Sequence, residues 1–256
     1  MKISSGIVGH EIGPDRQPID KRWLMAYNAA LGEVGEEAHP LFPVCYEWPA
    51  TNALRVATGL QELNARLVHA QHDLVLHRKV VPGEILGVSA RVVAATQRGP
   101  GAFVVFELIA KAGNETVSTT RYGMLYRGVT LEGGDRGSVD DPPKHDRELP
   151  TAGNFPVAAT AGHVYTECAR IWNPIHTDPE YARAAGLPGI ILHGTATLAL
   201  SVSQLTKNAK RVRCRFAGMV PMPSTLTVHA SRVGDEILFE TRDAKGKAVI
   251  ERGRIG

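Results

Sequence analysis

The chain of 256 residues is 43% hydrophobic and 21% charged, with a formal net charge of +3. These values are typical of a globular protein with an ample core, and they exclude disordered and fibrous chains. No segment approaches the roughly 20 apolar residues of a membrane span, the N-terminus lacks a secretory signal, and aromatic residues do not interleave with the basic ones. We therefore expect a cytoplasmic protein that binds neither membrane nor nucleic acid. The three cysteines show no C-x-x-C spacing, so neither a disulfide framework nor a metal site is expected.

The first half is predicted to hold one helix followed by strands. Apolar residues recur at three- and four-residue spacing from Leu54 to Leu67, which predicts a helix over residues 53–70. After a Val81-Pro82 step, alternating apolar residues predict strands at 86–92, 103–111 and 116–126.

Residues 129–154 are polar, rich in glycine, aspartate and proline, and show neither helical nor strand periodicity. We interpret this segment as a linker. It would separate a first domain over residues 1–128 from a second domain over residues 155–256.

The second half repeats the order of the first. An apolar run predicts a helix over 194–205, a Val220-Pro221 step follows, and strands are predicted at 226–233, 236–243 and 248–255. The recurrence of the Val-Pro step at a matching place indicates an internal duplication. The predicted architecture is an α+β fold in which an antiparallel sheet wraps a helix, twice over.

The strongest candidate for chemistry is the run Asn173-Pro174-Ile175-His176 in the second half. Pro174 fixes its own φ and keeps Asn173 out of the helical region, so the chain turns here and presents Asn173 and His176 from a loop. Further along, Leu192-His193-Gly194 opens the predicted helix. Two histidines, an amide and a helix that starts at glycine are suited to act on a polarised carbonyl.

Through these residues the sequence resembles the MaoC-like dehydratases, in particular the R-specific enoyl-CoA hydratase-2 group. In the second half the resemblance lies in Asn173-Pro174-Ile175-His176, Pro188-Gly189-Ile190-Ile191-Leu192-His193-Gly194 and Phe216-Ala217-Gly218-Met219-Val220-Pro221. In the first half it lies in Leu67-Val68-His69-Ala70-Gln71 and in residues 76–83. Together these segments span nearly the whole chain.

The resemblance implies a double hotdog, in which two antiparallel sheets form one extended sheet and each wraps a central helix. It implies a lyase that reversibly hydrates a 2-enoyl thioester, or dehydrates a 3-hydroxyacyl thioester, carried by coenzyme A or an acyl-carrier protein, in fatty acid metabolism. No metal or organic cofactor is implied. The first half would be a degenerate hotdog that shapes the acyl-chain site. The alternatives are an acyl-CoA thioesterase, an isomerase or a non-catalytic acyl-thioester-binding subunit, and the chain would be a monomer or a homodimer.

One position departs from the family motif, because the family's catalytic aspartate falls at Ile171. In the family the aspartate and the histidine hold and activate one water, so half of this acid–base pair is replaced. Glu167 would reach the water if the segment before Ile171 is helical, although a surface glutamate is the alternative. Asp178 would orient His176, with a helix N-cap as the alternative. In a third arrangement His176 acts alone, held by Asn173.

Further candidates flank this loop. The backbone N–H of Gly194 is expected to polarise the thioester carbonyl, with Thr195 beside it, while His193 braces the turn or contacts substrate. Trp172 is a candidate for lining the acyl site. Arg170 is a candidate for binding a carboxylate or phosphate of the substrate.

Overall fold

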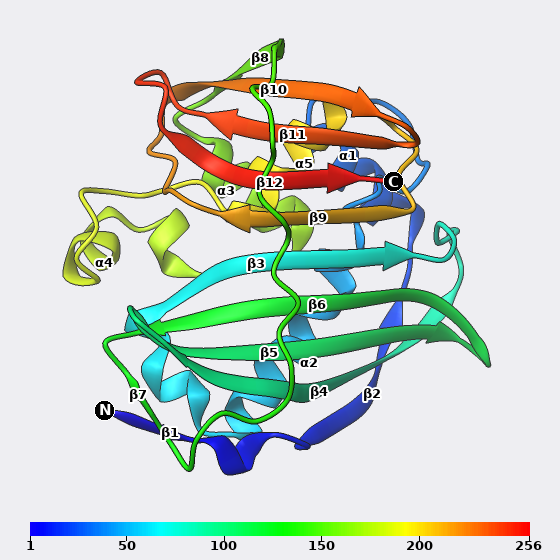
Figure 1. Ribbon diagram of the computed structural model, residues 1–256. Helices are drawn as coiled ribbons and strands as arrows, with labels where there is room; N and C mark the ends of the chain where they lie inside the picture. Colours follow the sequence, from blue (N-terminus) through cyan, green and yellow to red (C-terminus); the bar gives the residue numbers. More distant parts are fainter.

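Ten strands form one continuous antiparallel sheet, and the helices lie on one of its faces (Figure 1). The computed structural model describes all 256 residues. The strands are β1 Lys2–Ser4, β2 Glu11–Pro18, β3 Leu67–Leu76, β4 Ile85–Arg98, β5 Gly101–Ala112, β6 Glu115–Arg127, β7 Thr130–Glu132, β8 Thr151–Val157, β9 Arg211–Phe216, β10 Ser224–Val233, β11 Glu236–Arg242 and β12 Ala248–Ile255. The helices are α1 Lys21–Ala30, α2 Pro43–Ala57, α3 Ala161–Ala169, α4 Pro179–Ala184 and α5 Gly194–Ser203, and the 3-10 helices are η1 Ser5–Ile7, η2 Leu60–Arg66 and η3 Pro174–His176.

The strand order shows the internal repeat. It runs β2-β4-β5-β6-β3 through the first half and continues β9-β12-β11-β10-β8 through the second, so the two halves are arranged as mirror images in strand order. They meet where β3 pairs with β9, from Gln71 opposite Arg215 to Val75 opposite Arg211. With α2 packed in the first half and α5 in the second, this is the predicted α+β double hotdog.

The helix predicted over 53–70 is wrong in its position. The central helix of the first half is α2, which begins at Pro43 and ends at Ala57 because Gly59 turns the chain in the left-handed region, with φ of 70°; α1 was not predicted. The leucines beyond Gly59 belong to η2 and then to β3, whose backbone pairs with β6. The strand predictions in both halves are confirmed, as is the helix of the second half, which is two residues shorter than predicted.

The segment between β7 and β8 crosses the face of the sheet that the helices leave open (Figure 1). Arg136 exchanges two backbone hydrogen bonds with Ala95 of β4, and the Asp140 carboxylate pairs with Arg213 of β9 at 2.7 Å. The segment contains no helix or strand between the end of β7 and the start of β8, yet it is hydrogen-bonded to strands of both halves. The linker predicted over 129–154 differs at its ends, because it includes β7 and the first residues of β8.

The joint between the halves is also tied by charge. Asp73 of β3 accepts two hydrogen bonds from the guanidinium of Arg211, at 3.1 and 2.9 Å, and also pairs with Arg213 at 3.0 Å. These basic residues alternate along β9 with Val212 and Cys214, which are buried in the core. None of the helices has the length and apolar character needed to cross a bilayer.

The first half contains a fully buried acid, Glu47 of α2. Its carboxyl group accepts hydrogen bonds from Thr120 at 2.6 Å, Tyr122 at 2.5 Å and Ser118 at 3.3 Å, all on β6. Burial raises the pKa of Glu47 to about 7, against the pull of these donors toward the ionised form.

Replacing Glu47 with Gln is expected to make the folding free energy less dependent on pH. The carboxyl group has a pKa of 4.5 when unfolded and of about 7 when folded, so its contribution to stability falls as the pH rises between these values. Urea unfolding should show that the free energy of unfolding of Glu47→Gln rises relative to that of the unaltered chain, by up to roughly 3 kcal/mol, between about pH 5 and pH 8. If the difference in unfolding free energy between the two proteins does not change with pH, Glu47 is not protonated in the folded protein.

Candidate active site

The first part of the site is the N-terminus of α5. His193 is the N-cap and makes no side-chain capping bond. The first backbone hydrogen bond of the helix runs from the N–H of Thr197 to the carbonyl of His193. The N–H of Gly194 is therefore free of backbone partners at the positive end of the helix dipole. A Cβ at Gly194 would lie 3.3 Å from the ring of Phe216, so this amide is approached closely by an aromatic wall.

The second part is the loop that carries His176. Helix α3 ends at Ala169, and Arg170 turns the chain with a φ of 58°. The Asn173 side chain accepts a 3.4 Å hydrogen bond from the N–H of Ile175, which caps η3. Asn173 thus caps the short helix that carries His176, and the amide nitrogen of its side chain is not used by that cap.

His176 is held in one tautomer. Its Nδ1 lies 2.7 Å from the carbonyl oxygen of Ile191, and because a carbonyl only accepts, Nδ1 carries the proton. The other nitrogen, Nε2, is then an unprotonated acceptor. Burial lowers the pKa of this imidazole to about 4, so it is neutral at physiological pH. The residue is 8% exposed, and its Nε2 has no hydrogen-bond partner within the protein yet is not among the fully buried unpartnered atoms.

His176 stacks on His193, with ring centroids 3.6 Å apart and planes inclined by 25°. His193 is buried, its Nε2 lies 3.3 Å from the Thr166 hydroxyl, and its ring also packs against Tyr165. Burial and then the neighbouring His176 lower the pKa of His193 well below its usual value. His193 therefore joins the loop of His176 to the start of α5.

Thr195 takes part in a hydroxyl chain behind the site. Tyr165 donates to the Thr195 hydroxyl at 3.2 Å, and the Tyr27 hydroxyl lies 3.4 Å from that of Tyr165. Tyr27 comes from α1 of the first half, so this chain connects α5 to both α3 and α1.

Ile171, at the position of the family aspartate, is 4% exposed and belongs to the apolar core. The two acidic replacements are not brought to His176. Glu167 is on α3 as expected, but it faces solvent, and the Asp178 carboxylate caps α4 by accepting from the N–H groups of Glu180 and Tyr181 at 2.8 and 3.0 Å. The N-cap alternative for Asp178 is confirmed, and the imidazole is oriented by the Ile191 carbonyl instead.

The structure also accounts for Arg170 and Trp172 otherwise than as substrate ligands. The Arg170 guanidinium pairs with Asp20 at 3.1 Å and lies 4.1 Å above the ring of Trp23, so it fastens the end of α3 to α1. Trp172 is 65% exposed, which places most of its side chain in solvent rather than in a buried acyl site.

Residues 138–252 match the family model described as "MaoC like domain". The second half of the chain therefore carries a MaoC-like domain. Over 84% of its length it is 23% identical to the 3-hydroxyacyl-thioester dehydratase X of Mycobacterium tuberculosis, of which it covers 77%. It is 27% identical to the mouse peroxisomal multifunctional enzyme type 2 over 72% of its length, but it spans only 26% of that relative. The crystal structure of a MaoC-like dehydratase from Phytophthora capsici shares the fold, with a TM-score of 0.85 at 20% identity and coverage of 98% of this chain and 96% of that one.

The first half of the chain contributes residues that the motifs did not single out. His69 of β3 lies with its ring 4.8 Å from that of Phe216, which covers Gly194, and 4.9 Å from that of Tyr122. Tyr122 in turn binds Glu47. His69 and Phe216 both stand in segments that carry the family resemblance, so the signal was present, but only the paired strands show that they touch.

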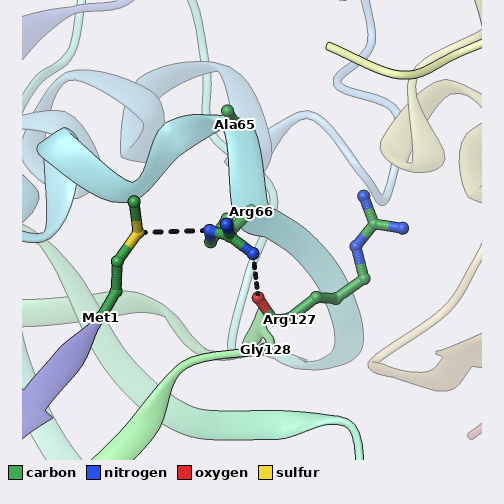
Figure 2. A pocket seen from close by; sticks show the side chains of 5 residues that line it. All are labelled: Met1, Ala65, Arg66, Arg127 and Gly128. Atoms are coloured by element: carbon green, nitrogen blue, oxygen red, sulfur yellow. Dashed lines mark hydrogen bonds between the residues drawn. The ribbon is translucent and has the colours of Figure 1, made fainter.

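A surface hollow of the protein, drawn in Figure 2, is lined by none of these residues. It is lined by Met1, Ala65, Arg66, Arg127 and Gly128, and Arg66 bonds across it to the sulfur of Met1 and the carbonyl of Arg127. The hollow includes none of the candidate site residues. No cluster of three or more potential metal-binding side chains is present.

Proposed function

We propose that this chain catalyses the reversible hydration of a 2-enoyl thioester to the 3-hydroxyacyl thioester. The thioester carbonyl would accept the N–H of Gly194, and Nε2 of His176 would take a proton from water as the hydroxyl adds to C3. The electron pair of the double bond then moves toward C2, which receives a proton from the imidazolium. Water is consumed, and no metal or organic cofactor is required.

One observation carries this proposal. The bare Nε2 of a neutral imidazole and the unpartnered N–H of a helix start are joined rigidly, because His176 stacks on His193 and His193 immediately precedes Gly194. A base and an oxyanion donor in one fixed arrangement are what addition to a conjugated carbonyl needs. The amide nitrogen of Asn173 is available to hold the water from the side of the loop.

The first half is proposed to shape the acyl-chain site. His69 and Phe216 meet at the joint beside Gly194, so a substrate bound there lies against both halves. The names of two relatives refer to enoyl-CoA and to 3-hydroxyacyl thioesters. The proposed substrate is accordingly a thioester carried by coenzyme A or by an acyl-carrier protein.

The test is to incubate the purified chain with crotonyl-CoA and with a longer 2-enoyl-CoA while following the conjugated enoyl absorbance. Loss of absorbance with 3-hydroxyacyl-CoA as the product supports the proposal. Release of free coenzyme A would instead identify a thioesterase. Substrate that raises the melting temperature but stays unaltered would identify a binding subunit.

Replacing Gly194 with Pro is expected to lower kcat by about 10²–10³-fold, because the amide proton is lost. Proline is well accepted as the first residue of a helix, and α2 of this chain begins with Pro43. His193 already has the extended backbone that precedes proline, with φ of −58° and ψ of 137°. Circular dichroism should show that the variant is folded.

The matched control is Gly194→Ala, which keeps the amide proton and adds only a methyl group at 3.3 Å from the Phe216 ring. Equal losses in the alanine and proline variants would assign the effect to crowding and would contradict a role for the N–H.

A further inference from the structure

His176 is a base without a charged partner. Its pKa is set by burial and by the Ile191 carbonyl, with no contribution from a carboxylate. Ile171 supplies an alkyl group to the core, Asp178 is occupied as a cap and Glu167 faces solvent. Beside the Asn173 amide, which can donate a hydrogen bond but cannot take up a proton, the site therefore offers one proton acceptor and one oxyanion donor.

Hydration needs more catalytic groups than these two. The water must be held for attack on C3 and must also release a proton, so a second group on the water is of value. The shift of a double bond along the acyl chain needs fewer groups. One base can remove a proton from C2 and return it to C4 on the same face, while hydrogen-bond donors stabilise the dienolate oxygen.

A weak base is sufficient for this second reaction when the oxyanion donors are in place. Ketosteroid isomerase, which also shifts a double bond, pairs a carboxylate base of pKa about 4.6 with two oxyanion donors. His176 has a comparable basicity, with a pKa of about 4, and the N–H of Gly194 is the donor at the helix start.

We propose that this site also interconverts 3-enoyl and 2-enoyl thioesters by moving one proton between C2 and C4 through Nε2 of His176. The C2–H bond breaks, its electrons form the C2=C3 bond by way of the dienolate, and the C3=C4 electrons take the proton back at C4. No water, oxidant or cofactor is consumed. The isomerisation rests on the proposed function only in that the thioester binds with its carbonyl at Gly194.

The burial of His176 adds a signature to this reaction. With the residue 8% exposed and substrate bound at Nε2, return of the proton to the substrate competes with its exchange into bulk water. Part of the hydrogen removed from C2 should therefore reappear at C4 rather than being replaced from solvent.

The experiment uses 3-hexenoyl-CoA labelled with deuterium at C2, with the full chain, His176→Ala and Ile171→Asp. Mass spectrometry follows the sum of 2-hexenoyl-CoA and 3-hydroxyhexanoyl-CoA, because hydration can consume the first product. We expect formation of this sum with some deuterium at C4, and a loss of at least about 10²-fold in His176→Ala. Ile171→Asp should change the ratio of hydration to isomerisation in favour of hydration.

Crotonyl-CoA is assayed in parallel, which separates the two proposals. Hydration of crotonyl-CoA with 3-hexenoyl-CoA unchanged would overturn the isomerisation and leave the hydratase. Isomerisation without hydration would support the further inference and overturn the proposed function. Isomerisation that persists in His176→Ala would overturn the role assigned to that residue.

Discussion

Hydration of crotonyl-CoA by His176→Ala is expected to be slower than by the unaltered chain by about 10²–10⁴-fold in kcat/KM. The substitution removes the unprotonated Nε2 that is held beside the start of α5. Binding should change little, because the N–H of Gly194 and the joint with the first half remain. The assay is initial-rate loss of the enoyl absorbance, with thermal unfolding to show that the variant is folded.

The control is His163→Ala, since this histidine is exposed on α3 and lies outside the stacked pair. A loss of similar size in the control, or none in His176→Ala, would contradict the assignment of the base.

The same assay has a pH signature. Because burial lowers the pKa of His176 to about 4, the imidazole is already unprotonated well below neutrality. The value of kcat/KM should stay level from about pH 8 to about pH 5, whereas an ordinary imidazole would lose its base form near a pH of about 6.5. A profile with its midpoint at that higher pH would show that His176 is solvated, or is not the base.

Ile171→Asp is expected to raise the rate of hydration by about 10²-fold, because it places a carboxylate where the family motif has one. The gain in activity comes with a loss of stability, since the side chain at this position is 4% exposed and a buried acid must be desolvated. The measurement is kcat with crotonyl-CoA beside the free energy of unfolding.

Ile171→Asn is the matched variant, with nearly the same shape as the aspartate but no ionisable group. A gain in the aspartate variant alone assigns the effect to the carboxylate. Equal rates in the two folded variants would contradict the idea that a second proton-handling group limits hydration.

The long strands in the middle of each half were predictable from the sequence because alternation is a local signal. The edge strands β2 and β8 and helix α1 were not predicted. The position of α2 was not predictable either, because this helix contains Pro49 in its interior and begins at Pro43, while the leucine spacing runs past Gly59 into η2 and β3. Regular spacing of leucines does not show where a helix ends and the following strand begins.

Some features of the candidate site were likewise predictable from the sequence, and others were not. The loop with Asn173 and His176 was predictable from the Asn-Pro step, and the N-cap at Asp178 was among the alternatives. The stacking of His176 on His193 was not, nor was the pairing of Arg170 with Asp20 across the two halves. Such contacts depend on how distant segments pack, and no local pattern in one sequence specifies them.

The two central helices begin differently, and under the proposed function this difference limits the number of thioesters that one sheet is expected to bind. Helix α5 starts at Gly194, whereas α2 starts at Pro43, which has no amide proton to offer a carbonyl oxygen. Since both helices belong to one chain, the start of one can change without the other. If the thioester binds at Gly194 as proposed, the expected stoichiometry is a single thioester for each ten-stranded sheet.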